Sequence, residues 1–171
     1  MRGIPGSGKS TFVEKNLPGA VVCSADKFFM KDGVYKYDHS QIALAHQWCK
    51  EEFAAAIARG ENLVVVDNTN IKFWHFENYI TAAKAAGYWV DIVHVWCDVR
   101  KASLRNIHGV PFDATAWMAS DMEVLTPCPV GVDRIFHARG EKEDSYYVQK
   151  HIFQGISISP KRWGSGKAFS D

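Results

Sequence analysis

Hydrophobic and polar positions along the chain follow two alternating patterns. Short apolar runs, rich in valine and isoleucine, indicate buried strands at residues 20–24, 62–67, 89–96 and 132–138. Apolar positions at helical spacing indicate helices at residues 11–15, 40–59, 72–86, 98–105 and 112–125. Because strands and helices alternate, we expect an α/β fold in which a parallel sheet lies between layers of helices.

A glycine-rich segment stands before the first predicted helix. Residues 3–10 read Gly-Ile-Pro-Gly-Ser-Gly-Lys-Ser, which is the spacing of a phosphate-binding loop. Glycines let consecutive backbone N–H groups approach phosphate oxygens, and the following helix directs its positive end at the same anion. A plain Gly/Ser turn is the alternative, but the helix-compatible run that follows favours nucleotide binding. The predicted nucleotide-binding residues are Gly3, Pro5, Gly6, Ser7, Gly8, Lys9, Ser10 and Thr11.

The side chains at the end of this loop have separate expected roles. Lys9 reaches the β- and γ-phosphates of ATP, and Ser10 places its hydroxyl on the Mg²⁺ that bridges them. Thr11 starts the helix near the α-phosphate. A phosphate loop normally follows a buried strand, and only Met1 and Arg2 precede this one. We therefore expect the first strand to be truncated, or to be contributed by residues absent from the sequence.

Polar residues follow the next two predicted strands. Asp26 comes directly after the strand at residues 20–24, at the sheet edge where open α/β folds bind ligands, and is a candidate general base. Helix capping explains an aspartate there equally well. Asp67 ends a Walker-B-like strand and is expected to support Mg²⁺ through water or to orient a neighbouring group. Asn68, Thr69 and Asn70 either contact the ligand or cap the following helix.

A basic segment follows the strand at residues 89–96. Arg105 is the first choice for a lid residue, because the charge on a transferring phosphoryl group must be neutralised while water is excluded. An arginine on a helix without that context is more often solvated or salt-bridged. In the next predicted helix, we expect Trp117 and Met122 to pack in the core.

Composition narrows the possible partners. The net charge of +1 gives no general attraction to nucleic acid or to an anionic membrane, so any nucleic-acid contact is local. The four cysteines include no CxxC pair, which favours reduced thiols and a cytoplasmic or nuclear protein. No apolar run approaches the roughly twenty residues of a membrane span. The oligomeric state is not indicated.

Taken in order, the phosphate loop, Ser24-Ala25-Asp26, Asp67-Asn68-Thr69-Asn70 and the segment from Arg105 to Pro111 resemble the polynucleotide-kinase-like P-loop kinases. That family includes phage polynucleotide kinase and kinase-like domains of ubiquitin-ligase-binding proteins. The resemblance implies a three-layer P-loop kinase fold with a basic helical lid, using ATP and Mg²⁺. It also implies that Asp26 is the base for an acceptor 5′-hydroxyl and that Arg105 belongs to the lid. We expect a kinase domain at residues 1–140 and an extension of unknown role at residues 141–171.

One position departs from the family pattern. Phage polynucleotide kinase has an arginine for the acceptor's phosphate three residues beyond its catalytic acid, and Phe29 stands there in this sequence. Lys27 or Lys31 takes over that contact, or Phe28 and Phe29 stack on an acceptor base, as aromatic residues do with single-stranded RNA or DNA. A kinase of a small metabolite or nucleoside is the alternative enzyme. A nucleotide-binding module that recruits a partner without phosphotransfer is the alternative of another class.

Overall fold

The computed structural model describes residues 1–142 and 145–150, with side chains described through residue 139. The helices are α1 (Lys9–Asn16), α2 (Ile42–Ala58), α3 (Glu77–Ala85), α4 (Val99–Arg105) and α5 (Phe112–Ser120), and short 3₁₀ turns cover Ala25–Phe29, His39–Gln41 and Phe73–His75. The strands are β1 (Val21–Cys23), β2 (Met30–Lys31), β3 (Val34–Tyr35), β4 (Val64–Val66), β5 (Asp91–Trp96), β6 (Arg134–Lys142) and β7 (Ser145–Lys150).

The central strands run parallel, as the sequence predicts. β1 pairs with β4, and β5 pairs with β6, in both cases in parallel. The first residues of the chain fill the position between β4 and β5. The N-terminal amine of Met1 donates to the Val66 carbonyl (2.7 Å), and the backbone of Arg2 exchanges hydrogen bonds with Val93 and Val95 (2.8 Å each). The phosphate loop therefore leaves the middle of the sheet.

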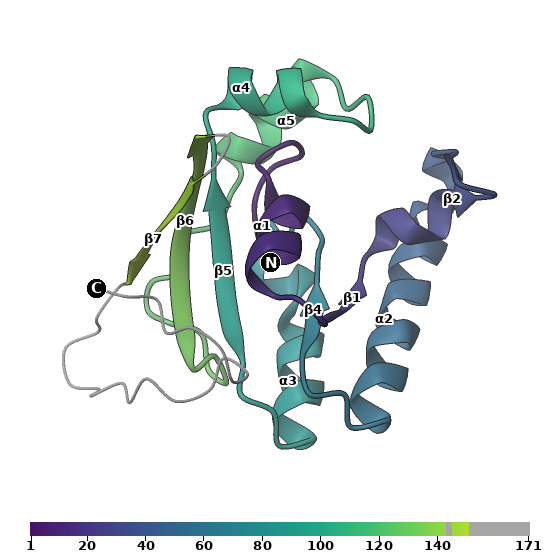
Figure 1. Cartoon of the computed structure of the whole chain (residues 1–171), viewed down its shortest axis with the longest axis vertical. Coiled ribbons are helices and arrows are strands. Elements are labelled where there is room, and N and C mark those ends of the chain that lie inside the picture. The colour runs from purple at the N-terminus through teal and green to yellow at the C-terminus, as the bar shows by residue number, and fades with distance from the viewer. Residues whose placement is uncertain (143–144, 151–171) are drawn as a thin grey trace.

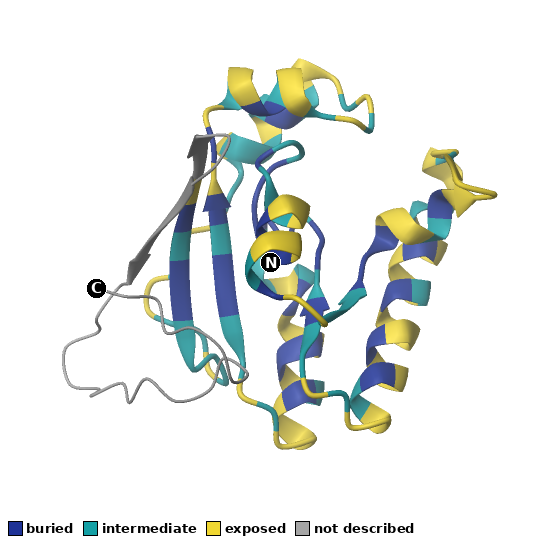
Figure 2. Ribbon diagram, in the orientation of Figure 1, coloured by how far each residue is buried: buried dark blue, intermediate teal, exposed yellow. Residues whose placement is uncertain are grey.

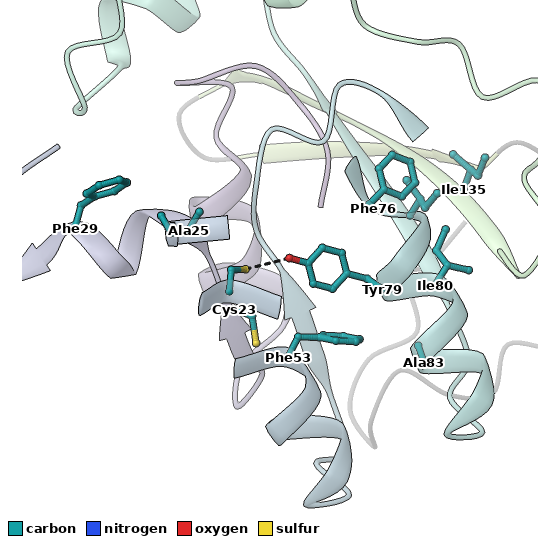
Figure 3. Close-up of a cluster of buried hydrophobic side chains, with 12 residues drawn as sticks. Cys23, Ala25, Phe29, Phe53, Phe76, Tyr79, Ile80, Ala83 and Ile135 are labelled. Atoms are coloured by element: carbon teal, nitrogen blue, oxygen red, sulfur yellow. Dashed lines mark hydrogen bonds between the residues drawn. The ribbon is translucent and has the colours of Figure 1, made fainter. Parts of the chain in front are cut away.

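Helices cover both faces of the sheet (Figure 1). On one face, Phe12 and Val13 of α1 pack against Val65, Val93 and Phe136. On the other face, Phe53 of α2 and Tyr79 and Ile80 of α3 are buried together with Phe76, just before α3, and with Cys23 and Ile135 of the strands (Figure 3). Ile92 of β5 belongs to the same cluster. Buried residues follow the strands and the inner sides of α2 and α3 (Figure 2). The α/β three-layer architecture predicted from the sequence is confirmed.

A small hairpin projects from the end of β1 and its 3₁₀ turn. β2 and β3 pair antiparallel, with Met30 opposite Tyr35. Asp32 (φ 52°) and Gly33 (φ 76°) form the tip, and positive φ at both central residues is the geometry of a type I′ turn. This tight Asp-Gly turn brings Tyr35 back opposite Met30.

Two predicted helices are shorter than expected. The helix predicted to reach residue 125 ends at Ser120, because the chain beyond it binds another segment: the Glu123 N–H donates to the Ile71 carbonyl (2.8 Å), and Asp121 pairs with Lys72 (2.6 Å). Trp117 is 59% exposed, so its expected core role is wrong. The helix predicted from residue 72 begins at Glu77, after a 3₁₀ turn whose first N–H donates to the Glu123 carboxylate.

The end of the described chain adds an edge strand. β7 pairs antiparallel with β6. Part of the extension predicted at residues 141–171 is therefore a strand, whereas residues 151–171 lie outside the described part. The domain boundary at residue 140 stays a prediction, although β6 itself continues to Lys142. Among the described residues, no helix is both long and apolar enough to cross a bilayer.

Candidate active site

The phosphate loop connects the central strand position to α1. Gly8 precedes the helix in the left-handed conformation (φ 96°), and Gly6 also has a positive φ of 73°. A Cβ atom at residue 6 would lie only 2.0 Å from the Ala102 carbonyl oxygen, so glycine is required where α4 approaches the loop. Gly3 donates its N–H to the Thr69 carbonyl (3.0 Å). Of the remaining loop residues, Pro5 is half-buried, Ser7 is buried, and Thr11 is exposed in the first turn of α1.

Lys9 turns back over its own loop. Its Nζ donates to the Ile4 carbonyl (3.1 Å). Burial lowers the pKa of its ammonium group, while the carboxylates of Asp67 and Asp26 act in the opposite direction. The carboxylates of Asp67 and Asp26 therefore both attract the Lys9 ammonium group. A neutral carbonyl is a weaker partner for an ammonium group than a phosphate oxygen, so Lys9 is placed to exchange one for the other.

Ser10 and Asp67 meet beside the loop. The Ser10 hydroxyl donates to Asp67 Oδ2 (2.7 Å), which connects the first turn of α1 to the end of β4. Asp67 is 6% exposed, and its Oδ1 is buried without a hydrogen-bond partner among the described residues. A hard cation such as Mg²⁺ takes hydroxyl and carboxylate oxygens together with phosphates and water. The donor set fits the predicted Mg²⁺ site.

The polar residues after β4 hold other segments in place. Asn68 Oδ1 accepts the Ala25 N–H (2.9 Å), directly beside Asp26. Asn70 donates to the Met1 carbonyl (2.8 Å), and the Thr69 carbonyl accepts the Gly3 N–H. Helix capping does not describe these bonds, since Lys72 and Phe76 precede the following helical turns, and ligand contact by the three residues stays a prediction. Asn68 positions the acceptor-side loop, and Asn70 positions the strand that leads into the phosphate loop.

Asp26 lies at the start of the 3₁₀ turn after β1. The Ser24 hydroxyl accepts the Asp26 N–H (3.3 Å), so Ser24 is the capping residue and the Asp26 carboxylate is left for other contacts. The Asp26 side chain is 52% exposed. Tyr35 donates its hydroxyl to Oδ1 (3.1 Å), and His108 Nε2 lies 3.8 Å from Oδ2. Neither Tyr35 nor His108 was a candidate site residue in the sequence, which offers no motif that joins them to Asp26.

The two phenylalanines after Asp26 differ in exposure. Phe29 is 2% exposed, and its ring contacts those of Phe28, Tyr35 and Tyr37 at centroid distances of 5.4, 6.1 and 5.2 Å. Phe29 cannot stack on an acceptor base without leaving the core. Phe28 is half-buried against Trp48 (6.3 Å) and stays a candidate acceptor contact. Lys27 donates to the Val22 carbonyl, back along β1.

Arg105 ends α4, at the base of the expected lid. Its Nη2 donates to Cys97 Sγ at the tip of β5 (2.8 Å), and its Nε donates to the Lys101 carbonyl (3.4 Å). Cys97 and Ala102 pack against Ile4 of the phosphate loop, so α4 rests on that loop. Burial raises the pKa of the Cys97 thiol, and the neighbouring guanidinium opposes this shift. Arg105 thus lies close to the loop, with its guanidinium turned towards Cys97.

A separate cavity of about 720 Å³ lies against β5 and β6. Its lining includes His94, His137, Trp96, Met122 and Leu125, and none of Lys9, Ser10, Asp26 and Asp67. Burial, with the charges of Arg2 and His137, lowers the pKa of His94 to about 4. This cavity is distinct from the crevice that holds the predicted catalytic residues.

Comparisons with known proteins place the phosphate loop in a known domain family. A family model described as "AAA domain" matches residues 1–123. The chain belongs to this family. It is 30% identical over 137 residues to human NEDD4-binding protein 2, an alignment that covers 76% of this chain and 8% of that protein. The chain therefore spans a small part of that relative's length.

Among solved structures, the chain is similar to a gluconokinase from Sinorhizobium meliloti 1021. The similarity has a TM-score of 0.49 and a sequence identity of 17%, and it covers 82% of this chain and 81% of the other. Membership of the AAA-domain family, with an intact phosphate loop, supports nucleotide-dependent phosphotransfer in general. The acceptor has to be argued from the site itself.

Proposed function

We propose that this chain is an ATP-dependent kinase that transfers the γ-phosphoryl group to a hydroxyl, with the 5′-hydroxyl of an RNA or DNA strand as the first candidate acceptor. One arrangement carries the proposal. Ser10 of the phosphate loop bonds to Asp67 (2.7 Å), and Asn68, the next residue, accepts the N–H of Ala25 beside Asp26 (2.9 Å). The charges of Asp67 and Asp26 both act on the Lys9 ammonium group. A phosphate-binding cation, a metal-supporting carboxylate and a candidate base thus lie together, as in-line phosphoryl transfer requires.

The residues divide the reaction between them. The loop amides and Lys9 bind the phosphates, and Ser10 and Asp67 would hold Mg²⁺, which neutralises charge on the β- and γ-phosphates when it is bound. Asp26 takes the proton from the acceptor hydroxyl as that oxygen bonds to the γ-phosphorus. The bond from the γ-phosphorus to the β-bridging oxygen breaks, and ADP leaves. Arg105 would turn from Cys97 to the transferring group as the lid closes.

The acceptor class has a second candidate, a small metabolite or nucleoside. Phe29 occupies the place of the phosphate-binding arginine of polynucleotide kinases and is buried, so that position offers no contact to a strand. The net charge of +1 likewise adds no general attraction to nucleic acid. The resemblance of the segment from Asp67 to Asn70 favours the polynucleotide.

The direct test is transfer of labelled phosphate from ATP. Short RNA and DNA oligonucleotides with 5′-hydroxyl ends are incubated with the protein and Mg²⁺, beside nucleosides and a metabolite mixture. Labelled oligonucleotide ends support the polynucleotide kinase. Label on a small molecule alone moves the assignment to the metabolite kinase. ATP binding with no transfer to any acceptor supports the partner-recruiting module instead.

The role of Asp26 is tested with Asp26→Asn. We expect ATP affinity to be kept and transfer to fall about a hundred- to ten-thousandfold, the range for loss of a general base. Asp32→Asn is the matched control, because Asp32 lies at the exposed hairpin tip and asparagine tolerates its positive φ. Equal transfer by Asp26→Asn and the wild type would contradict the base assignment.

A further inference from the structure

Two side chains from distant segments meet at the Asp26 carboxylate. The Tyr35 hydroxyl, on β3, donates to Oδ1 (3.1 Å), and His108 Nε2, in the loop between α4 and α5, lies 3.8 Å from Oδ2. The rings of Tyr35 and His108 lie against each other, with centroids 4.4 Å apart and planes inclined by 48°. The contact therefore joins the hairpin to the lid directly over the proposed base.

Each partner is held by its own segment. The tight turn at Asp32 and Gly33 places Tyr35, whose ring also contacts Phe29. Burial raises the pKa of the Tyr35 hydroxyl and the charge of Asp26 raises it further, so the hydroxyl stays protonated and donates.

The loop that carries His108 is closed on itself. The His108 N–H donates to Asn106 Oδ1 (3.0 Å), and the Asn106 side chain donates to the Val110 carbonyl (2.8 Å). His108 Nδ1 is buried and has no hydrogen-bond partner among the described residues. These hydrogen bonds hold the loop, and the imidazole ring lies with its Nε2 atom towards Asp26.

The distance between His108 Nε2 and Asp26 Oδ2 limits which other groups can bind to Oδ2. A separation of 3.8 Å exceeds a hydrogen bond, yet it leaves no room for a water molecule between the two atoms. Oδ1 is already bonded to Tyr35. Oδ2 accepts no hydrogen bond from Tyr35 and is the oxygen that His108 faces, so it is the side from which we expect an acceptor hydroxyl to approach.

We propose that Tyr35 and His108 are positioning residues of the acceptor site: Tyr35 orients the carboxylate, and His108 caps Oδ2 until an acceptor hydroxyl replaces it. This inference rests on the proposed role of Asp26. The Asp26 side chain is 52% exposed even so, and His108 covers only the approach to Oδ2. The side reaction, in which Asp26 takes a proton from water as its oxygen bonds to the γ-phosphorus and the bond to ADP breaks, is slowed on that side.

The first test needs neither an acceptor nor activity. The His108 ring signals are recorded by NMR in the full chain at one pH, with His108→Gln identifying them. We expect Asp26→Asn to change the His108 ring chemical shifts, because Asp26 Oδ2 lies 3.8 Å from Nε2. Asp32→Asn, at the exposed hairpin tip, should leave them unchanged. His108 ring signals unchanged by Asp26→Asn overturn the contact.

The second test measures ATP hydrolysis without an acceptor. We expect His108→Gln to raise it about three- to tenfold, an effect of roughly 1 kcal/mol on the barrier. The double variant His108→Gln/Asp26→Asn should lose the increase, and the exposed His39→Gln should leave hydrolysis unchanged. Unchanged or slower hydrolysis in His108→Gln overturns the cap. If no oligonucleotide or small molecule is phosphorylated, the proposed function fails, while the NMR contact measurement and ATP hydrolysis still decide this inference.

Tyr35→Phe separates orientation from capping. Without the Tyr35 hydroxyl, Oδ1 loses the hydrogen bond that holds the orientation of the carboxylate. We expect kcat for transfer to fall about tenfold with an unchanged Kd for ATP. Tyr37→Phe, which removes a hydroxyl that bonds His39 instead, is the matched control. Equal kcat in Tyr35→Phe and the wild type contradicts the orienting role.

Discussion

The two halves of the crevice are built differently. The donor half, consisting of the phosphate loop, Ser10 and Asp67, lies on the central strands and already carries its own hydrogen bonds, one of them to the buried Asp67. The acceptor half, consisting of Asp26, Tyr35 and His108, combines an exposed carboxylate with two half-buried rings, and side-chain contacts join His108, from the loop after α4, to the other two. On the proposed function, the donor half would bind one constant group, the triphosphate, whereas the acceptor half can be altered by small movements of the hairpin or the lid. Variants in each half should therefore fail in different ways.

The largest expected effect belongs to the donor half. Lys9→Ala removes the cation that exchanges the Ile4 carbonyl for phosphate oxygens, and we expect transfer to fall about a hundred- to thousandfold. Lys15→Ala, at the exposed end of α1, is the matched control. Single-turnover transfer and ATP binding measure the change. A loss below tenfold would mean that Lys9 does not bind the transferring phosphate.

Asp67→Asn should change the requirement for metal. The substitution keeps a hydrogen-bond acceptor for Ser10 but removes the charge at the buried, unpartnered Oδ1. We expect the Mg²⁺ concentration for half-maximal activity to rise about 10- to 100-fold. Magnesium titrations of the wild type and Asp67→Asn provide the measurement. The same Mg²⁺ concentration for half-maximal activity in both proteins would show that Asp67 does not support the metal.

Asn68→Ala tests the connection between the halves. It leaves the buried Ala25 N–H without a partner, which should lower the free energy of unfolding by about 1 to 3 kcal/mol. Because Ala25 precedes Asp26, we expect transfer to fall while the Kd for ATP stays the same. Urea denaturation and transfer kinetics are compared with Asn78→Ala, on the exposed side of α3. Weaker ATP binding in Asn68→Ala would show that the halves are not separable.

The smallest effect concerns the strand under the donor half. His94 pairs with Arg2, and its pKa is lowered to about 4, so the folded protein keeps it neutral where the unfolded chain, with an ordinary pKa near 6.5, is protonated. The unfolded state then binds more protons between these values, and stability falls as the pH drops from about 7 to 5.

Replacing His94 measures how much this residue contributes to the decrease in the free energy of unfolding at low pH. We expect His94→Gln to remove about 1 kcal/mol of the decrease between pH 7 and 5, less than the full shift because His94 is only partly buried. The exposed His39→Gln serves as the control, and urea denaturation at both pH values gives the numbers. An identical decrease in His94→Gln and the wild type would contradict the assignment.

The sequence predicts the donor half well because its signals are local. The phosphate loop lies within eight residues, and Asp67 follows an apolar strand directly, so parallel-sheet topology brings the two together. The strand order at the centre follows from the same parallel-sheet topology. Met1 and Arg2 lie between β4 and β5 and bond to both of these strands. Both signals, the loop and the acid after the strand, can be recognised from residues that are close together in the sequence.

The acceptor half depends on contacts that short spacing does not encode. Tyr35 reaches Asp26 through the twist of a small hairpin, and His108 reaches it from a loop more than eighty residues further along the chain. Phe29 resembles an exposed stacking residue in the sequence, yet the aromatic residues around it enclose its ring. The helix predicted through residue 125 ends early because Glu123 binds Ile71, a tertiary contact that overrides local propensity.

Gly6 leaves no room for a side chain beside the Ala102 carbonyl, and on the proposed function this close approach would couple the triphosphate to the lid. A displacement of the loop backbone at Gly6 would alter the space available to α4, which carries Arg105 and leads to His108. Linkage is reciprocal: whatever factor lid closure adds to ATP affinity, bound ATP adds to the closed population. On the proposed function, nucleotide binding and opening of the acceptor site would therefore share one equilibrium.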